Sequence, residues 1–298
     1  MSEKHLALFR SLNQCSSTAR TSINIPKNVT IDQPIVILYD NNDSSPENYI
    51  SIGKNSKAQL IELYLNNTTT KLTNNAKTTI NLDDNACLTH TILQQSTNYD
   101  TQFTKIYATQ KTNSQLHTQI LLHGGNSNNI SLHVLLAGSN AICNINALEY
   151  TKQQETQALD IQVEHKHANS TSNTAIKSVL DNSSHCLMNG KILVAKNANL
   201  VKADLQHKTM LLAEHAKIDS KPQLEIYNDD VACSHGSSIG KLDFNALLYM
   251  NTRGISTIEA KQLLLQSFIA PVINAIPHAA IQQYMYQLIF PGENLCSI

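Results

Sequence analysis

Residues Asn228–Asp243 read NDDVACSHGSSIGKLD and separate two parts of the chain that differ in their hydrophobic pattern. Short apolar and alternating runs, typical of strands, precede this stretch, and longer runs with helical periodicity follow it. Within it, Cys233 and His235 are two residues apart, so on a strand their side chains project from the same face and could share a metal or cluster site. The stretch is therefore both the junction of the fold and a candidate functional site.

Upstream of the junction the sequence predicts a series of short strands. These runs are rich in Val, Ile and Thr, and they are divided by Asn, Ser, Gly and Asp, which favour turns. No helical pattern intervenes, which excludes a doubly wound sheet and leaves a sandwich, a propeller or a β-helix. The predicted strands are Ile35–Tyr39, Gln59–Leu65, Thr78–Leu82, Cys87–Leu93, Phe103–Tyr107, Leu116–Leu122, Ile130–Leu136, Ala141–Leu148, Leu159–Glu164, Ala175–Leu180, Lys191–Val194, Leu200–Ala203 and Leu224–Ile226.

Asparagine is expected to form the corners between these strands, because the chain has only 9 glycines and Asn tolerates the left-handed region. Asn pairs stand at several breaks: Asn41-Asn42, Asn66-Asn67, Asn74-Asn75 and Asn128-Asn129. Aromatic residues make up only 5% of the chain and Trp is absent, which disfavours an immunoglobulin-like sandwich and favours a solenoid of stacked coils. Such a stack needs covered ends, since an open terminal coil is an exposed sheet edge.

Helical patterns are expected at both ends of the chain. A short helix is predicted over Glu3–Leu12. After the junction, Asp243 can cap a helix over Phe244–Met250, which Gly254 ends. The sequence thus predicts three parts: an N-terminal helical segment over 1–30, a β-helix over 31–240 and a C-terminal helical domain over 241–298.

The C-terminal domain is predicted to contain two further helices. Ser256 and Glu259 form a capping-box pattern that opens a helix over Ile258–Ile269, and Pro271 is expected to interrupt or kink it. A last amphipathic run covers Ala279–Phe290. These helices carry more apolar surface than they need for one another, so they must pack on the β-region or on a partner.

Composition excludes several classes of protein. The net charge is -1, with Lys and Arg scattered among acids, which argues against a nucleic-acid or membrane-surface protein. The six cysteines lack paired spacing, which disfavours a disulfide framework or a zinc ribbon. No signal peptide is evident, and no run approaches the ~18 apolar residues of a membrane span. We expect a soluble, cytoplasmic protein.

Two chemical interpretations of the junction fail on its sequence. A phosphate loop needs four residues between its glycines and a hydroxyl after the Lys, whereas three residues separate Gly236 from Gly240 and Leu242 follows Lys241. The G-x-S-x-G pattern around Ser238 would need an acid and then a histidine on later strands. The only later histidine is His278, in a helical region, so the glycines and serines are interpreted as turn geometry, even though His123-Gly124-Gly125 could be imagined as an oxyanion loop.

Metal ligation remains open on the residues alone. His165 and His167 form an H-x-H pair, but no C-x-x-C or H-E-x-x-H spacing fixes a closed site. The twelve histidines can equally be surface residues or satisfied strand residues. For Cys233 and His235 the alternative is a buried thiol beside a structural histidine.

A longer motif resembles a known family. Lys221–Ile255, KPQLEIYNDDVACSHGSSIGKLDFNALLYMNTRGI, with EAKQLL at Glu259–Leu264, resembles the C-terminal signature of the SufB/SufD family of iron-sulfur cluster assembly scaffolds, nearer to its SufD-like members. KSVLD, NGKILV and MLLAEHA, at 177–181, 189–194 and 210–216, are similar to the preceding coils of that family. The resemblance implies a mainly β fold: a right-handed parallel β-helix (solenoid) with a short N-terminal helix and a small C-terminal helical domain.

The resemblance also implies a role. SufD-like subunits are non-catalytic scaffolds that pair with a SufB-like subunit through their β-helices and dock a SufC-like ATPase through the C-terminal helices. A transient iron-sulfur cluster is built at the SufB-SufD interface, with His235 and Cys233 as the implied metal ligands and no cofactor expected on the isolated chain. ATPase docking is expected on Asp243–Ile273, at Leu247, Leu248, Arg253, Leu264 and Phe268. Whether the chain alone forms a homodimer stays open.

Two departures from the family pattern accompany the resemblance. The chain has room for only one N-terminal helix, and His207-Lys208-Thr209 stands where the family tends to have Asn, so a corner is expected to differ there. Two other functions remain as alternatives. One is a stand-alone β-solenoid hydrolase or carbohydrate-active enzyme, and the other is a structural relative that keeps the partners but binds no cluster.

Overall fold

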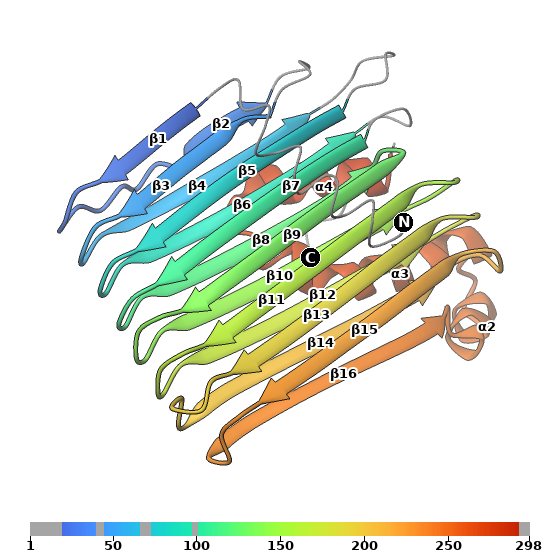
Figure 1. The fold of residues 1–298 in the computed structure, drawn as a ribbon. Coiled ribbons are helices and arrows are strands. Elements are labelled where there is room, and N and C mark those ends of the chain that lie inside the picture. The colour runs from blue at the N-terminus through green and yellow to red at the C-terminus, as the bar shows by residue number, and fades with distance from the viewer. Residues whose placement is uncertain (1–19, 40–44, 66–72, 97–100, 292–298) are drawn as a thin grey trace.

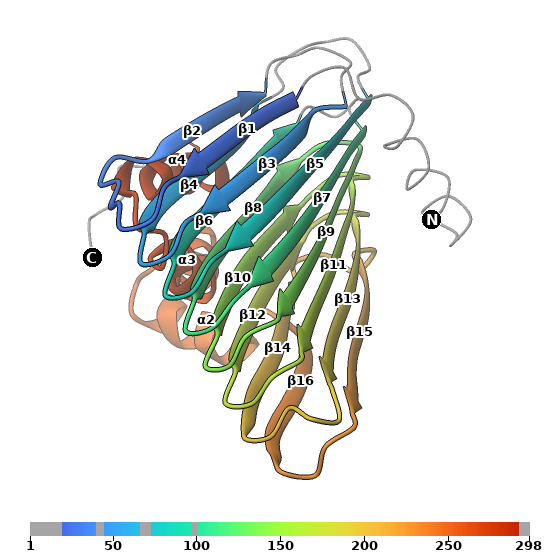
Figure 2. The same cartoon turned by 60° about the vertical axis from the view of Figure 1, so that its left-hand side comes forward.

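The structure is a computed structural model that describes residues 20–39, 45–65, 73–96 and 101–291. Within these residues the chain forms two parallel sheets of eight strands each (Figure 1). Odd-numbered strands build one sheet, ordered β1 to β15, and even-numbered strands build the other, ordered β2 to β16. Each strand pairs in parallel with the strand two elements later, so the coils stack as a solenoid (Figures 1 and 2). The predicted mainly β solenoid is confirmed.

Most of the strands are longer than predicted, and there are more strands than were predicted. They are β1 Arg20–Ile25, β2 Ile35–Tyr39, β3 Glu47–Ile52, β4 Lys57–Leu65, β5 Thr73–Leu82, β6 Cys87–Ser96, β7 Thr101–Gln110, β8 Gln115–Gly124, β9 Ser127–Leu136, β10 Ile142–Thr151, β11 Thr156–His165, β12 Thr171–Leu180, β13 His185–Val194, β14 Val201–Leu211, β15 Lys217–Ile226 and β16 Val231–Lys241. Three of them, β1, β3 and β16, were not predicted, and β1 lies inside the predicted N-terminal segment 1–30. The helix expected over Glu3–Leu12 lies outside the described residues.

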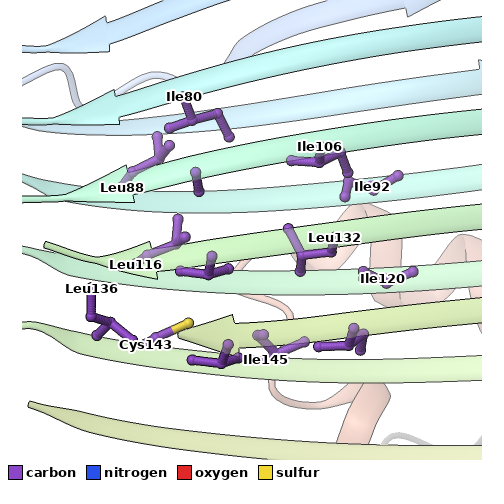
Figure 3. Close-up of a cluster of buried hydrophobic side chains, with 14 of the residues drawn as sticks. Ile80, Leu88, Ile92, Ile106, Leu116, Ile120, Leu132, Leu136, Cys143 and Ile145 are labelled. Carbon is purple, nitrogen blue, oxygen red and sulfur yellow. The ribbon is translucent and has the colours of Figure 1, made fainter. Parts of the chain in front are cut away.

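The hydrophobic core fills the space between the two sheets. Alternate residues of each strand point inward, as in the buried–half-buried alternation of β11. Because paired strands are in register, like positions stack along the solenoid. Ile92 and Ile120 from the even-numbered sheet meet Ile106 and Leu132 from the odd-numbered sheet in one continuous cluster (Figure 3).

Asparagines form the corners that join the two sheets, as expected, but they are single residues. Asn28, Asn55, Asn85, Asn113 and Asn140 all have positive φ, near 60°. Their side chains form a ladder in which each amide donates to the carbonyl oxygen of the preceding corner, with N–O distances of 2.8 to 3.0 Å. The predicted corner pairs Asn74-Asn75 and Asn128-Asn129 lie within β5 and β9, so that assignment was wrong, and the pairs at 41–42 and 66–67 lie outside the described residues.

Of three C-terminal helices, α3 (Thr257–Ile273) and α4 (Ala279–Ile289) pack against the outer face of the even-numbered sheet, and α2 (Phe244–Thr252) contacts α3 (Figure 2). Asp243 and Ser256 cap α2 and α3 as predicted, through bonds to Asn245 N and Glu259 N. Pro271 was predicted to interrupt or kink this helix after Ile269. Instead α3 continues to Ile273, because Pro271 lies in the final turn, where few backbone hydrogen bonds remain to be lost.

The junction itself is a strand. Val231–Lys241 forms β16, paired in register with β14 along its whole length. The interpretation of Gly236 to Gly240 as a turn was therefore wrong: neither glycine has a positive φ, and parallel pairing with β14 holds the segment extended. The expectation of a different corner at His207 was also wrong, because His207-Lys208-Thr209 lies inside β14.

Candidate functional site

One end of the solenoid is formed by β15 and β16, each the last strand of its sheet. We call the inward-pointing residues of these two strands the terminal face: Ile218, Ser220, Pro222, Leu224, Ile226, Val231, Cys233, His235, Ser237 and Ile239. On β16 these residues pair with buried residues of β14, and residues in register point to the same side of a parallel sheet. In the described chain no further coil follows β15 and β16, so the solenoid interior opens to solvent there.

Cys233 and His235 lie next to each other on the terminal face. Cys233 pairs with Ala203 and packs against the core, and its burial raises the pKa of its thiol. His235 pairs with Leu205 and is exposed. Two residues along a strand are about 6.6 Å apart, so the two side chains emerge side by side on the terminal face, as their spacing predicted.

The described chain does not contain a complete metal site. Within residues 20–291, leaving out the undescribed gaps, no group of three His, Cys, Asp or Glu side chains could hold a metal ion. Structural zinc and most iron-sulfur clusters take four protein ligands. Cys233 and His235 could supply two of them, and any further ligands would have to come from outside the described residues.

The other histidine pair does not act as a metal site. His165 is buried and contacts Ser170 Oγ through Nδ1 at 2.8 Å and Ser172 Oγ through Nε2 at 2.9 Å. His167 is exposed in the corner that follows. Both ring nitrogens of His165 thus have hydroxyl partners, and burial lowers its pKa to about 4. His165 is a satisfied strand residue.

The hydrolase pattern has no catalytic geometry. Ser238 is exposed on β16, on the side of the strand opposite to Ser237 and the terminal face. His123 ends β8, which lies four strands from β16 in the same sheet, roughly 19 Å away at the usual strand spacing. The glycine that precedes this serine serves packing, because a Cβ on Gly236 would come within 2.5 Å of the Gln206 side chain.

Four of the residues predicted to dock an ATPase lie on α2 and α3, and the fifth, Arg253, directly follows α2. Leu248 and Arg253 are exposed, and Leu247 and Leu264 are half-buried. Phe268 instead packs toward the chain's own sheet, where the Lys177 ammonium lies 4.8 Å from its ring centroid.

Sequence analysis did not single out the most exposed apolar side chains of these helices. They are Phe244, Tyr249 and Ile258, which are 73%, 61% and 73% exposed. Their outward positions depend on which helix face the sheet covers, and the weak amphipathicity of α2 gives no signal for it.

A chain of polar side chains leads from the interior to the terminal face, and sequence analysis did not identify it. Ser178 Oγ lies 2.5 Å from Glu149 Oε2 and 2.9 Å from His207 Nε2. His207 Nδ1 lies 2.8 Å from Ser220 Oγ, which lies 2.9 Å from Ser237 Oγ. The sequence does contain one signal for these residues. Glu149 and His207 fall on the inward positions of their alternating strands, where most of the other residues are apolar.

One cavity lies among the loops that join even-numbered to odd-numbered strands. It has a volume of about 430 Å³, and its lining residues are Asn126, Gln153, Gln154, Glu155, Asn182 and Ser183. It holds a single carboxylate, whereas glycoside hydrolysis ordinarily uses two. Among the residues that the structure describes, no helix is long and apolar enough to cross a membrane.

Comparison with known proteins identifies the family and the relatives that this chain resembles. The family model described as "SUF system FeS cluster assembly, SufBD core domain" matches residues 36–268. The iron-sulfur cluster assembly protein SufD of Escherichia coli (strain K12) is 24% identical over 296 residues, which cover 97% of this chain and 70% of the relative. SufD of Bacillus subtilis (strain 168) is 25% identical over 273 residues, which cover 89% of this chain and 62% of the relative. The chloroplastic protein ABCI7 of Arabidopsis thaliana is 23% identical over 288 residues, covering 92% and 61%.

The match extends over the part of the chain that forms the solenoid and its junction. Residues 36–268 run from β2 through β16 into α3, and they include Cys233 and His235. The chain spans about two thirds of the length of these relatives. Because the matched domain accounts for most of the sequence, the chain belongs to the SufB/SufD family of the SUF iron-sulfur cluster assembly system, as a SufD-like member.

Proposed function

We propose that this chain is a non-catalytic scaffold subunit on which an iron-sulfur cluster is assembled together with a SufB-like subunit. The cluster is cargo and is not a resident cofactor. The observation that carries the proposal is the terminal face, where an exposed imidazole and a half-buried thiol emerge at the open end of the solenoid. Family membership supplies the chemistry, and the open end suggests where a second subunit would bind.

The terminal face has the properties of a protein interface. An edge strand exposes unpaired backbone N–H and C=O groups, and proteins usually cover such edges. Apolar side chains accompany the edge here: Ile239 on β16 is 53% exposed, Ile226 at the end of β15 is 39% exposed, and Tyr227 directly after it is 63% exposed. A SufB-like solenoid that stacked on this end would extend both sheets and bury these side chains.

The ligand chemistry also requires a partner. Thiolate and imidazole are both suited to iron-sulfur centres, and a neutral imidazole is available near pH 7. His235 is exposed, so it can reach a cluster without a change in the fold. Two ligands are too few for a closed site, and therefore the proposal assigns the remaining ligands to the SufB-like subunit.

Docking of a SufC-like ATPase belongs to the same proposal. The predicted residues Leu247, Leu248, Arg253, Leu264 and Phe268 lie on α2 and α3 or directly after α2, and exposed Phe244, Tyr249 and Ile258 extend their apolar surface. Arg253 is near Tyr249, with 5.3 Å between the guanidinium carbon and the ring centroid. Phe268 is half-buried, so only the exposed part of its side chain is available to a partner.

The test is coexpression of the chain with SufB-like and SufC-like subunits, followed by copurification, iron analysis and visible absorbance. We expect a ternary complex that carries iron, and we expect His235→Ala to keep the complex but lose most of its iron. His167→Ala, a change at an exposed corner histidine, serves as the matched control. Unchanged iron in His235→Ala would remove the ligand role and favour a purely structural subunit, whereas failure to copurify either partner would overturn the scaffold proposal itself.

A further inference from the structure

The last coils of the solenoid contain a continuous hydrogen-bonded chain from a buried carboxyl to the terminal face. Glu149 on β10, Ser178 on β12 and His207 on β14 are fully buried, Ser220 on β15 is half-buried and Ser237 on β16 is exposed. The four successive distances lie between 2.5 and 2.9 Å. We propose that these five side chains form a proton relay that connects Glu149 with the terminal face.

The hydrogen count of the chain allows two states. With Glu149 ionised, Ser178 donates to Glu149 Oε2, so His207 must donate to Ser178 through Nε2–H. His207 Nδ1 then accepts from Ser220, and Ser220 accepts from Ser237. With Glu149 protonated, every bond reverses, and Nδ1–H of His207 donates to Ser220. Each bond is satisfied in both states.

Passing one proton along the chain switches the tautomer of His207 and leaves its ring neutral. The O–H bond of Glu149 breaks as Ser178 gains that proton and gives its own to Nε2. The proton on Nδ1 passes to Ser220, the proton of Ser220 passes to Ser237, and the proton of Ser237 leaves to solvent. One proton has moved from the carboxyl to the terminal face, and no other charge has changed.

The surroundings favour this behaviour. Burial raises the pKa of Glu149 to about 7 and lowers that of His207 to about 4, so near neutral pH the carboxyl exchanges a proton while the imidazole stays uncharged. Glu149 Oε1 has no hydrogen-bond partner among the described residues. The buried Cys186 lies close to this carboxyl, because Glu149 helps to raise the pKa of its thiol, and Glu155 acts on the same thiol in the same direction. Thr209 Oγ1, 3.2 Å from His207 Nε2, can accept or donate and therefore fits both states.

The outlet lies beside His235, whereas Cys233 is four residues, about 13 Å, from Ser237 along the strand. Ser237 is two residues from His235 on the same side of β16, about 6.6 Å along the strand. A thiol must lose its proton when it binds a metal. Through the relay, Glu149 can act as a buried acceptor for such a proton. This use rests on the proposed function, whereas the existence of the relay does not depend on it.

The test uses the isolated full-length chain with ¹⁵N-labelled histidine rings, and His207→Asn identifies the resonances of His207. Between about pH 5 and about pH 9 we expect the protonated nitrogen of His207 to change from Nδ1 to Nε2 without formation of an imidazolium. Glu149→Gln should abolish the change. Ser178→Ala should also abolish it while the infrared band of the Glu149 carboxyl still titrates, and Ser131→Ala, at an outward strand position, should behave as the parent.

A single His207 tautomer across this pH range would overturn the relay, whether or not Glu149 titrates. A tautomer change that persists in Ser178→Ala would overturn the proposed connection. Neither result depends on iron or on a partner, so failure of the relay is distinguishable from failure of the scaffold proposal.

Discussion

At the scale of single residues, Glu149 links the interior of the fold to pH. Its carboxyl is fully buried, and burial raises its pKa from 4.5 to about 7. Between these two values the unfolded chain releases the proton and the folded chain retains it, so the free energy of unfolding falls as pH rises. Above about pH 7 both states are ionised and the loss is complete.

The prediction is that Glu149→Gln removes this part of the pH dependence. A shift of this size corresponds to about 3 kcal/mol, because each pKa unit is worth about 1.4 kcal/mol. Urea unfolding from about pH 4.5 to about pH 8 should therefore show a gap of up to about 3 kcal/mol between parent and variant that develops with rising pH. Glu214→Gln, at an exposed corner, is the control, and parallel curves for parent and Glu149→Gln would contradict the prediction.

Sequence alone could identify some residues of the site and not others. Cys233 and His235 share a face through strand spacing of two, which is a local property. Glu149, Ser178 and His207 come from three different coils, and their contacts exist only because β10, β12 and β14 stack in a fixed register. That register depends on corner lengths and tertiary packing, which no short window of sequence contains.

At the scale of elements, the Asn ladder fixes the corners. Asn85 has φ 58°, donates to Asn55 at 2.8 Å and accepts from Asn113 at 3.0 Å. Asn tolerates this backbone conformation, glycine adopts it without cost, and alanine pays about 1–2 kcal/mol there.

We predict that Asn85→Ala lowers the free energy of unfolding by about 2–3 kcal/mol, and that Asn85→Gly loses only the ladder bonds, at about 1 kcal/mol. Asn81→Ala, at an exposed position inside β5, should cost less than either. Thermal or urea unfolding measures the three. Equal losses for Ala and Gly at position 85 would show that backbone conformation does not limit this corner.

The docking helices allow a second prediction at this scale. Leu248 is 52% exposed on α2, so Leu248→Arg should leave folding intact and reduce copurification of a SufC-like ATPase at least ~10-fold, the effect of losing about 1.4 kcal/mol. Leu38→Arg, at an exposed leucine of β2, is the matched control. Undiminished copurification by Leu248→Arg would exclude this part of α2 from the docking surface.

The starts of the helices were predictable because the capping residues lie next to them in the sequence. The surface that the helices present to solvent was not predictable. Asp243 and Ser256 lie directly before α2 and α3 and bond to their first turns, as the sequence predicted. The burial of Phe268 depends on Lys177, 91 residues away in the chain. The turn assigned to Gly236–Gly240 failed for the same reason, since pairing with β14 overrides the local preference of glycine.

At the scale of the whole molecule, the solenoid has two different ends. At one, β1 and β2 begin the sheets, and at the other β15 and β16 end them with Cys233, His235 and Ser237 on the terminal face. Short strands and Asn corners were enough to predict a solenoid. The odd-and-even division into two sheets and the inclusion of the junction in the last strand follow from long-range pairing.

Binding of a SufB-like subunit to the terminal face is the interaction that we propose for the whole molecule. Hydrogen–deuterium exchange of the chain, alone and in complex with that subunit, tests it directly, since pairing at an edge slows the exchange of its free amides. We expect slower exchange in β15 and β16 on complex formation and unchanged exchange in β1 and β2. Protection elsewhere, with β15 and β16 exchanging as in the free chain, would contradict it.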